Sequence, residues 1–164
     1  MLIEAFIEIA HDYPDWCVRL YGEGEESLDL KELVKKEEME KQVFFMGQVS
    51  NVAEKLCKAS VFVLPSKCEG MPNALIEAMT LGTAVISTDC PCGGPADLIQ
   101  NGENGILIGV DDKKALKEAL IKLIDDEEYR DKLASNASRI VERLHPDSVN
   151  RQWKEYIEAN LRKC

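Results

Sequence analysis

A short apolar run, followed by a proline, a tight loop and a helical pattern, constrains the fold of this chain more than any other feature. The run from Val61 to Leu64 predicts a buried strand, because β-branched and aromatic residues follow one another with no polar residue between them. Pro65 and Gly70 end the strand. From Asn73 to Leu81 the apolar residues have helical spacing, and Pro72 stands where helices start. The stretch therefore predicts a strand, a loop and a helix N-terminus.

This predicted loop offers two kinds of binding group. Free amides and the positive end of the helix dipole attract anions at a helix N-terminus. Glu69 lies in the loop and Glu77 about one turn inside the helix, and carboxylates accept hydrogen bonds from sugar hydroxyls. Amides for phosphate and carboxylates for hydroxyls suit a nucleotide sugar, whereas the alternative is that Glu69 is a surface loop acid and Glu77 a solvated helix residue.

Similar strand and helix patterns alternate along the rest of the chain. The expected strands are 16–21, 43–46, 61–64, 84–87 and 105–108, and the expected helices are 2–10, 27–39, 52–58, 73–81, 96–100 and, with breaks near 125–126 and 145–147, 112–162. This alternation predicts an α/β fold, a Rossmann-like three-layer arrangement with a parallel sheet of about five strands. We expect one domain over residues 1–164, with 146–164 as a C-terminal helix. Trp153 and Tyr156 are expected to be core residues of this helix, and the alternative is that the helix leaves apolar surface exposed.

Charge and composition exclude several classes of function. The net charge is -10 and the pI is near 4.8, so the chain repels nucleic acid and anionic lipid. No apolar run is long enough to span a bilayer and no secretory leader pattern follows Met1, so a cytoplasmic location is expected. The six cysteines lack regular spacing and are expected to be reduced thiols. Cys90-Pro-Cys92 is not a CxxC pair, and no metal site or cofactor is expected.

The order of the motifs resembles the carboxy-terminal, donor-binding half of the retaining GT-B glycosyltransferases of family four. The motifs that carry this resemblance are Gly22-Glu23-Gly24, Val43 to Gly47, Val61 to Ser66, Glu69 to Met79, Gly82 to Ile86, Gly93-Gly94 and Gly105 to Ile108. The residues of the segments Glu69 to Asn73 and Asp89 to Pro95 resemble those of bacterial polysaccharide transferases of N-acetylhexosamines, N-acetylgalactosamine in particular.

The resemblance implies a role for each matching residue. Glu69 would be the catalytic-site acid that accepts hydrogen bonds from the transferred sugar, and Glu77 would hold the ribose hydroxyls. The backbone of Gly70, Met71, Pro72 and Asn73 would lie along the sugar and diphosphate of the donor. Gln48 and Val49 would offer backbone groups to the base, most often uracil. Lys67 and the side chain of Asn73 would make additional contacts to the donor. Gly93 and Gly94 are either turn glycines or contacts on the phosphate side of the donor.

The chain also departs from the family pattern at its start. Family members have a strand that ends in Gly-Arg, followed by a lysine, before the first helix, and these two cations clamp the diphosphate. This chain starts inside that helix, so we expect the first strand, the cation clamp and the amino-terminal acceptor domain to be missing. The isolated chain is expected to be inactive.

Two function classes remain open. The first is the donor domain of a glycosyltransferase that uses no cofactor and moves a sugar from a UDP-sugar to a glycan or lipid-linked glycan, with membrane association only as a peripheral property of the full-length protein. The second is a non-catalytic truncated module that binds nucleotide or mediates association. A dinucleotide-dependent dehydrogenase is disfavoured because no strand is followed by Gly-x-Gly-x-x-Gly.

Overall fold

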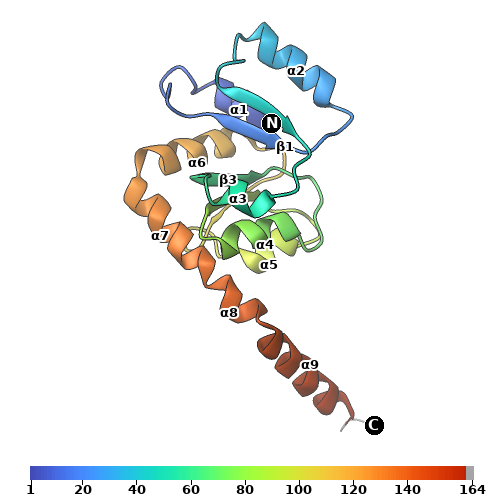
Figure 1. Ribbon diagram of the computed structural model, residues 1–164. Coiled ribbons are helices and arrows are strands. Elements are labelled where there is room, and N and C mark those ends of the chain that lie inside the picture. The colour runs from blue at the N-terminus through green and yellow to red at the C-terminus, as the bar shows by residue number, and fades with distance from the viewer. Residues whose placement is uncertain (162–164) are drawn as a thin grey trace.

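Five short strands alternate with helices in the computed structural model, which describes residues 1–161 (Figure 1). The strands are β1 (Val18–Tyr21), β2 (Val43–Gly47), β3 (Val61–Leu64), β4 (Ala84–Thr88) and β5 (Ile106–Ile108). The helices between them are α1 (Leu2–Ile7), α2 (Ser27–Lys36), α3 (Val52–Leu56), α4 (Asn73–Thr80) and α5 (Gly94–Leu98). Four helices follow β5: α6 (Lys113–Asp125), α7 (Glu127–Ser138), α8 (Ile140–Leu144) and α9 (Pro146–Leu161).

Every strand pair in the described residues is parallel, as predicted, but the strands form two sheets. One sheet has the order β1-β2, with Val18 opposite Val43, and the other has the order β3-β4-β5. A doubly wound sheet has the order 3-2-1-4-5-6. If β1 and β2 take the places of strands 2 and 3, the division between β1 and β3 falls at the place of strand 1. The predicted parallel α/β fold is confirmed. The sheet is interrupted at the position where the family pattern has its first strand, which was expected to be missing from this chain.

Strand β4 is buried on both faces, which explains the apolar run from Ala84 to Ile86 with which it begins. Successive side chains of a strand point to opposite faces, and accordingly Ile86 belongs to one cluster of buried residues while Val85 belongs to another. The first cluster includes α6, and the second includes α4 through Leu75 and Met79. Helices therefore cover both faces of this sheet, which gives the three layers expected from the sequence.

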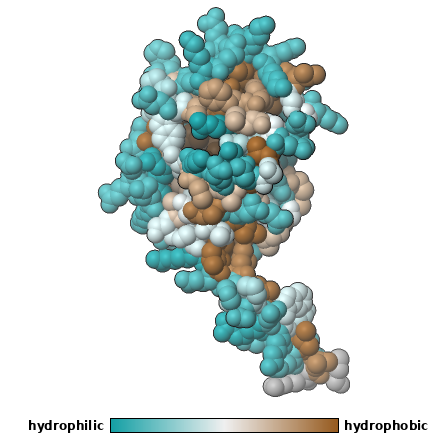
Figure 2. Space-filling model, viewed as in Figure 1, coloured by the Kyte–Doolittle hydropathy of each residue, from teal (hydrophilic) through white to brown (hydrophobic). Residues whose placement is uncertain are grey.

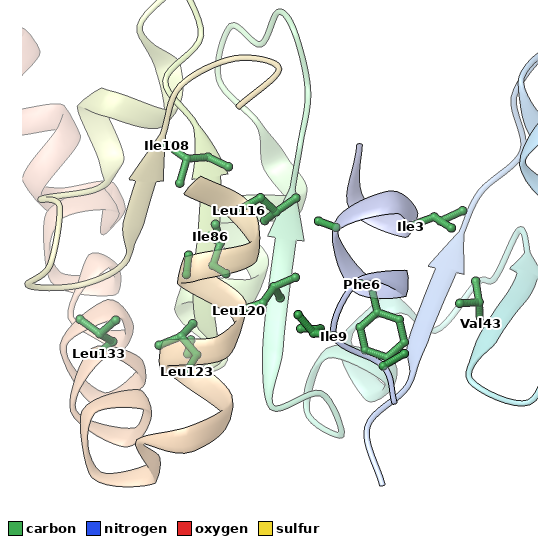
Figure 3. Close-up of a cluster of buried hydrophobic side chains, with 14 of the residues drawn as sticks. Ile3, Phe6, Ile9, Val43, Ile86, Ile108, Leu116, Leu120, Leu123 and Leu133 are labelled. Atoms are coloured by element: carbon green, nitrogen blue, oxygen red, sulfur yellow. The ribbon is translucent and has the colours of Figure 1, made fainter. Parts of the chain in front are cut away.

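The larger cluster extends from this sheet to α1. Figure 3 shows Leu116, Leu120 and Leu123 of α6 directed toward the same interior as Phe6 of α1 and Ile9 just after it. Because the cluster also contains residues of β1 and β2, apolar contacts join the two sheets across the interruption.

An ion-pair cluster at the surface joins the same two helices. Glu8, directly after α1, accepts hydrogen bonds from Lys113 at 2.8 Å and Lys117 at 2.7 Å on α6. These hydrogen bonds lower the pKa of Glu8 from 4.5 to about 2.

Several helix boundaries differ from the sequence prediction: α1 and α2 end three residues earlier than expected, and α3 and α5 end two residues earlier. The break at His145-Pro146 is confirmed, since a residue before proline is driven out of the helical region and His145 has a ψ of 137°. Helix α5 begins at Gly94 instead of residue 96, because proline is well tolerated in the first turn of a helix and Pro95 occupies such a position. An additional break falls at Arg139, between α7 and α8.

Helix α9 projects away from the rest of the molecule, and the prediction that Trp153 and Tyr156 lie in the core is wrong (Figures 1 and 2). None of its described residues is buried, and Trp153, Tyr156, Ile157 and Leu161 are all more than half exposed. These four residues have helical spacing and share one face of α9, but none of them is buried by the described chain. Residues 162–164 of the predicted C-terminal helix lie outside the described residues. No helix in residues 1–161 combines the length and apolarity that a membrane crossing needs.

Candidate functional site

The loop between β3 and α4 runs from Pro65 to Pro72 at the carboxyl end of β3. Pro65 has no amide hydrogen to continue the strand pairing, and Pro72 stands at the N-cap of α4 in extended conformation, with φ -77° and ψ 103°. No side chain caps α4 among the described residues. The first amides of a helix have no partner within it, so those at Asn73 and Ala74 are free to meet a ligand.

Buried hydrogen-bonding groups on the neighbouring strand β4 and directly after it fix the start of this loop. The Ser87 hydroxyl donates to the Leu64 carbonyl at 3.4 Å, the Thr88 hydroxyl donates to the Ser66 carbonyl, and the Cys90 thiol donates to the same Ser66 carbonyl at 3.2 Å. All three donors are buried. Sequence analysis missed this support, although the polar pair Ser87-Thr88 at the end of an apolar strand was a signal for it.

The loop after β4 touches the middle of the β3–α4 loop backbone to backbone. A Cβ placed on Gly94 would lie 1.4 Å from the Gly70 carbonyl oxygen, so only glycine permits this approach. Gly93 precedes it with a φ of +79°, a left-handed conformation that glycine adopts easily. The backbone conformation at Gly93 and the close contact at Gly94 thus explain why glycine occupies both positions, and the Gly94 contact brings this loop beside Gly70.

The two candidate acids differ in how firmly they are held. Glu69 is half-buried, and the Ser66 hydroxyl donates to its Oε1 at 2.7 Å; within residues 1–161 its Oε2 accepts no hydrogen bond. Glu77 lies in the second turn of α4, is exposed, and makes no side-chain hydrogen bond or ion pair in the described part of the chain. Both carboxylates therefore keep oxygens that can accept from hydroxyl groups.

Most of the other residues predicted in or next to this loop are accessible. Gly70, Met71 and Asn73 are exposed, whereas Pro72 is buried. Lys67 is exposed and its Nζ lies 3.0 Å from the Asp111 carboxylate, in the turn after β5. Lys67 is therefore paired with a protein acid in this structure, and a ligand phosphate would have to compete for it.

A hollow lies at the carboxyl ends of β1 and β2. Its lining is Gly22, Glu23, Gly24, Ser27, Lys31, Phe45, Met46 and Gly47. Gln48 and Val49 follow Gly47 directly but do not line the hollow. Lys31 Nζ lies 5.6 Å from the centroid of the Phe45 ring, within the range of a cation–π contact. Sequence analysis missed Lys31 and Phe45, and the signal was the Gly-x-Gly turn at the end of a strand.

In the part of the chain that the structure describes, the metal-binding side chains form no cluster that could hold an ion. Among residues 1–161, no three His, Cys, Asp or Glu side chains are placed to hold one metal ion. Two thiols do approach each other: Cys68 Sγ and Cys92 Sγ are 3.2 Å apart. This hydrogen bond raises the pKa of the Cys68 thiol, and the charge of Cys92, burial and the charge of Glu69 add to the shift.

The sequence of this chain matches a known protein family. Residues 1–140 match the profile of the family described as glycosyl transferases group 1. An α-1,4-N-acetyl-D-galactosaminyltransferase of Campylobacter jejuni, whose name gives a PP-undecaprenol-linked acceptor, is 34% identical over 71% of this chain and 32% of its own length. The chain spans less than half the length of the curated relatives it matches first.

Solved structures share the fold. The C-terminal domain of a glycosyl transferase group 1 family protein from Francisella tularensis superposes with a TM-score of 0.78 at 30% identity, covering 87% of this chain and 76% of that chain. Anabaena HepE, crystallised in complex with UDP, superposes with a TM-score of 0.83 at 24% identity over 96% of this chain and 44% of its own.

Proposed function

The chain belongs to the glycosyl transferases of group 1 and has the fold of the C-terminal half of a GT-B enzyme, and from this premise we propose that it is the donor-binding domain of a retaining glycosyltransferase. Its ligand is a UDP-sugar, and the longer protein transfers the sugar to a glycan or lipid-linked glycan. The remainder of that protein supplies the acceptor site and cations for the diphosphate.

The loop from Pro65 to Asn73 carries this proposal. Buried donors on and just after β4, together with the Gly94 contact, hold it rigidly. The loop presents an acid, free amides and the start of α4 to solvent at one strand end. Ligands of open α/β sheets bind at the carboxyl ends of the strands. A rigid array of donors and acceptors lowers the cost of ordering on binding, so this loop suits a polar ligand.

Each part of a nucleotide sugar has a matching group. Glu69, with its Oε1 held by Ser66, accepts a hydrogen bond from a hydroxyl of the transferred sugar through Oε2. The amides of Gly70 to Asn73 lie along the sugar and diphosphate, where the N-terminus of α4 favours negative charge. Glu77 binds the ribose hydroxyls, and the backbone of Gln48 and Val49 meets the base.

Catalysis then consists mainly of positioning and charge stabilisation. The departing diphosphate gains negative charge, and preorganised amides stabilise such charge best when they need no rearrangement. The β3–α4 loop is held in place by its contacts with Thr88, Cys90 and Gly94, so its amides at the start of α4 need no rearrangement. Lys67 adds a cation beside the donor once it releases Asp111.

The donor specificity is a finer part of the same proposal. The Campylobacter relative is named for transfer of N-acetylgalactosamine to a lipid-linked glycan, and the Anabaena structure holds UDP. These names support a UDP-N-acetylhexosamine donor and a bacterial glycan acceptor.

Titration with UDP, followed by amide chemical shifts of the 15N-labelled chain, tests the proposal. We expect weak binding with shifts at Val49, Met71 and Glu77. Glu77→Gln should weaken binding about tenfold or more, because a hydrogen bond to a charged group contributes roughly 1.5–3 kcal/mol. Glu128→Gln is the matched control, since Glu128 is an exposed helical glutamate with no partner in residues 1–161. Equal affinities for wild type and Glu77→Gln, or shifts confined to other surfaces, would refute the donor-site assignment.

A further inference from the structure

Two exposed cysteines from different loops meet at the rim of the candidate site. Cys68 lies in the β3–α4 loop and Cys92 in the β4–α5 loop, 24 positions later, and their Sγ atoms are 3.2 Å apart. Both side chains point toward each other, since the contact is a thiol hydrogen bond. A disulfide needs an S–S distance of about 2.05 Å, so the sulfurs have to approach by only about 1.2 Å.

The surrounding structure holds the two loops together at this point. Gly94, two residues after Cys92, packs against the Gly70 carbonyl, two residues after Cys68. On the other side, the buried Cys90 thiol donates to the carbonyl of Ser66 at 3.2 Å. Two loop–loop contacts therefore flank the thiol pair, so backbone packing as well as the side-chain rotamers keeps the two sulfurs close.

We propose that Cys68 and Cys92 are an oxidisable dithiol site that forms a reversible disulfide across the two loops. The oxidant is a peroxide: one thiolate attacks a peroxide oxygen to give a sulfenic acid and release water or alcohol. The second thiol then attacks that sulfur, the S–S bond forms and the sulfenic oxygen leaves as water. With hydrogen peroxide the two thiols lose two protons and two electrons, the peroxide is reduced, and two waters form. A dithiol reductant reverses the change.

The neighbouring cysteine is a poor alternative partner. Cys90 is buried, and its thiol is engaged with Ser66 and with the Thr88 hydroxyl at 3.4 Å. Because the Cys92 contact raises the pKa of Cys68, little Cys68 thiolate is present at neutral pH, so the first step is expected to be slow. The site is suited to sustained rather than brief oxidant exposure.

The disulfide changes the loop that carries Glu69 and Gly70. Drawing the sulfurs together displaces Cys68, and Glu69 follows it directly in the chain. Hydrogen-bond strength falls steeply when donor and acceptor move off their preferred geometry. This consequence rests on the proposed function: if the loop binds UDP, the oxidised chain should bind it about tenfold more weakly, which corresponds to one lost charge-assisted hydrogen bond.

The first measurement is peptide mapping by mass spectrometry under non-reducing conditions, after the purified chain has been treated with hydrogen peroxide. We expect a Cys68–Cys92 cross-link that dithiothreitol removes. In a melting experiment the oxidised chain should gain about 5 °C or more, since the cross-link closes a loop of about 25 residues. Cys92→Ser should abolish both effects, and Cys57→Ser, which changes an exposed cysteine elsewhere, should leave both intact.

Two results would overturn the proposal. The first is the absence of a Cys68–Cys92 cross-link, including its replacement by a link to Cys90. The second is a cross-linked chain that binds UDP as tightly as the reduced chain does. If the reduced chain binds no UDP at all, the donor-site proposal fails, while the mapping still decides the disulfide chemistry.

Discussion

Replacing Gly94 with alanine tests the contact on which the candidate site is built. By local propensity the change should be favourable, because Gly94 is the first residue of α5 and alanine is more stable than glycine within a helix by roughly 0.5–1 kcal/mol. The tertiary structure predicts the opposite sign. The new Cβ would lie 1.4 Å from the Gly70 carbonyl oxygen and 2.6 Å from its carbonyl carbon.

The size of the effect follows from these distances. Heavy atoms pack at about 3.5 Å or more, so the two loops must separate by about 2 Å. The obstructing atoms are backbone atoms, which have no alternative rotamer. Overpacking a buried site commonly costs 1–3 kcal/mol, and we expect about 3 kcal/mol here. A chain of this size should then melt roughly 6–12 °C lower.

Urea and thermal unfolding followed by circular dichroism measure this change in the free energy of unfolding. Gly24→Ala is the matched control, because a Cβ at Gly24 meets nothing within 4 Å and its backbone is not left-handed. It should unfold within about 0.5 kcal/mol of wild type. Gly94→Ala should also lose UDP binding. A Gly94→Ala variant as stable as wild type would show that the loops can part freely, and the account of a rigid site would be wrong.

Three further predictions concern other parts of the molecule. Thr88→Val should lower the free energy of unfolding by about 0.5–1.5 kcal/mol, because the Ser66 carbonyl loses one of its two buried donors and keeps only the Cys90 thiol. The exposed Thr80→Val should change it little, and equal effects in denaturant titrations would contradict this. Two lysines of α6 lower the pKa of Glu8 to about 2, so the stability that the Glu8 ion pairs contribute is present above pH 4.5 and lost as the pH falls toward 2. The difference in unfolding free energy between wild type and Glu8→Gln should therefore shrink over that range, and a difference independent of pH would refute this prediction. Leu133→Ala should cost about 2–5 kcal/mol, and Leu161→Ala, on the exposed face of α9, less than about 0.5 kcal/mol; comparable losses on thermal unfolding would mean that α9 is packed.

Local patterns predicted the elements well because apolar periodicity reports burial directly. The strand from Val61 to Leu64 has the predicted bounds, and the helix after Pro72 starts at the predicted residue. Pairing between strands depends on which neighbours are present in space, so the division between β1 and β3 could not be read from any one strand. The same limit explains Trp153 and Tyr156: a helical apolar face predicts that something covers it, but not that this chain supplies the cover.

The sequence proposed the residues of the candidate site but could not predict the contacts that support them. Glu69, Glu77 and the glycines stand out in a motif of fixed order. The hydroxyl of Thr88 and the contact of Gly94 with Gly70 arise between segments more than twenty residues apart, and no spacing rule links them. Likewise, Cys68 and Cys92 meet only because both follow neighbouring parallel strands.

The interruption between β1 and β3 gives the molecule two parts that can open separately. In residues 1–161, no backbone hydrogen bond joins these strands, so side-chain contacts alone transmit cooperativity between the sheets. In native-state hydrogen exchange, the amides of β1 and β2 should therefore exchange through a sub-global opening, at lower free energy than those of the doubly covered β4. A strand inserted between β1 and β3 would merge these two units into one.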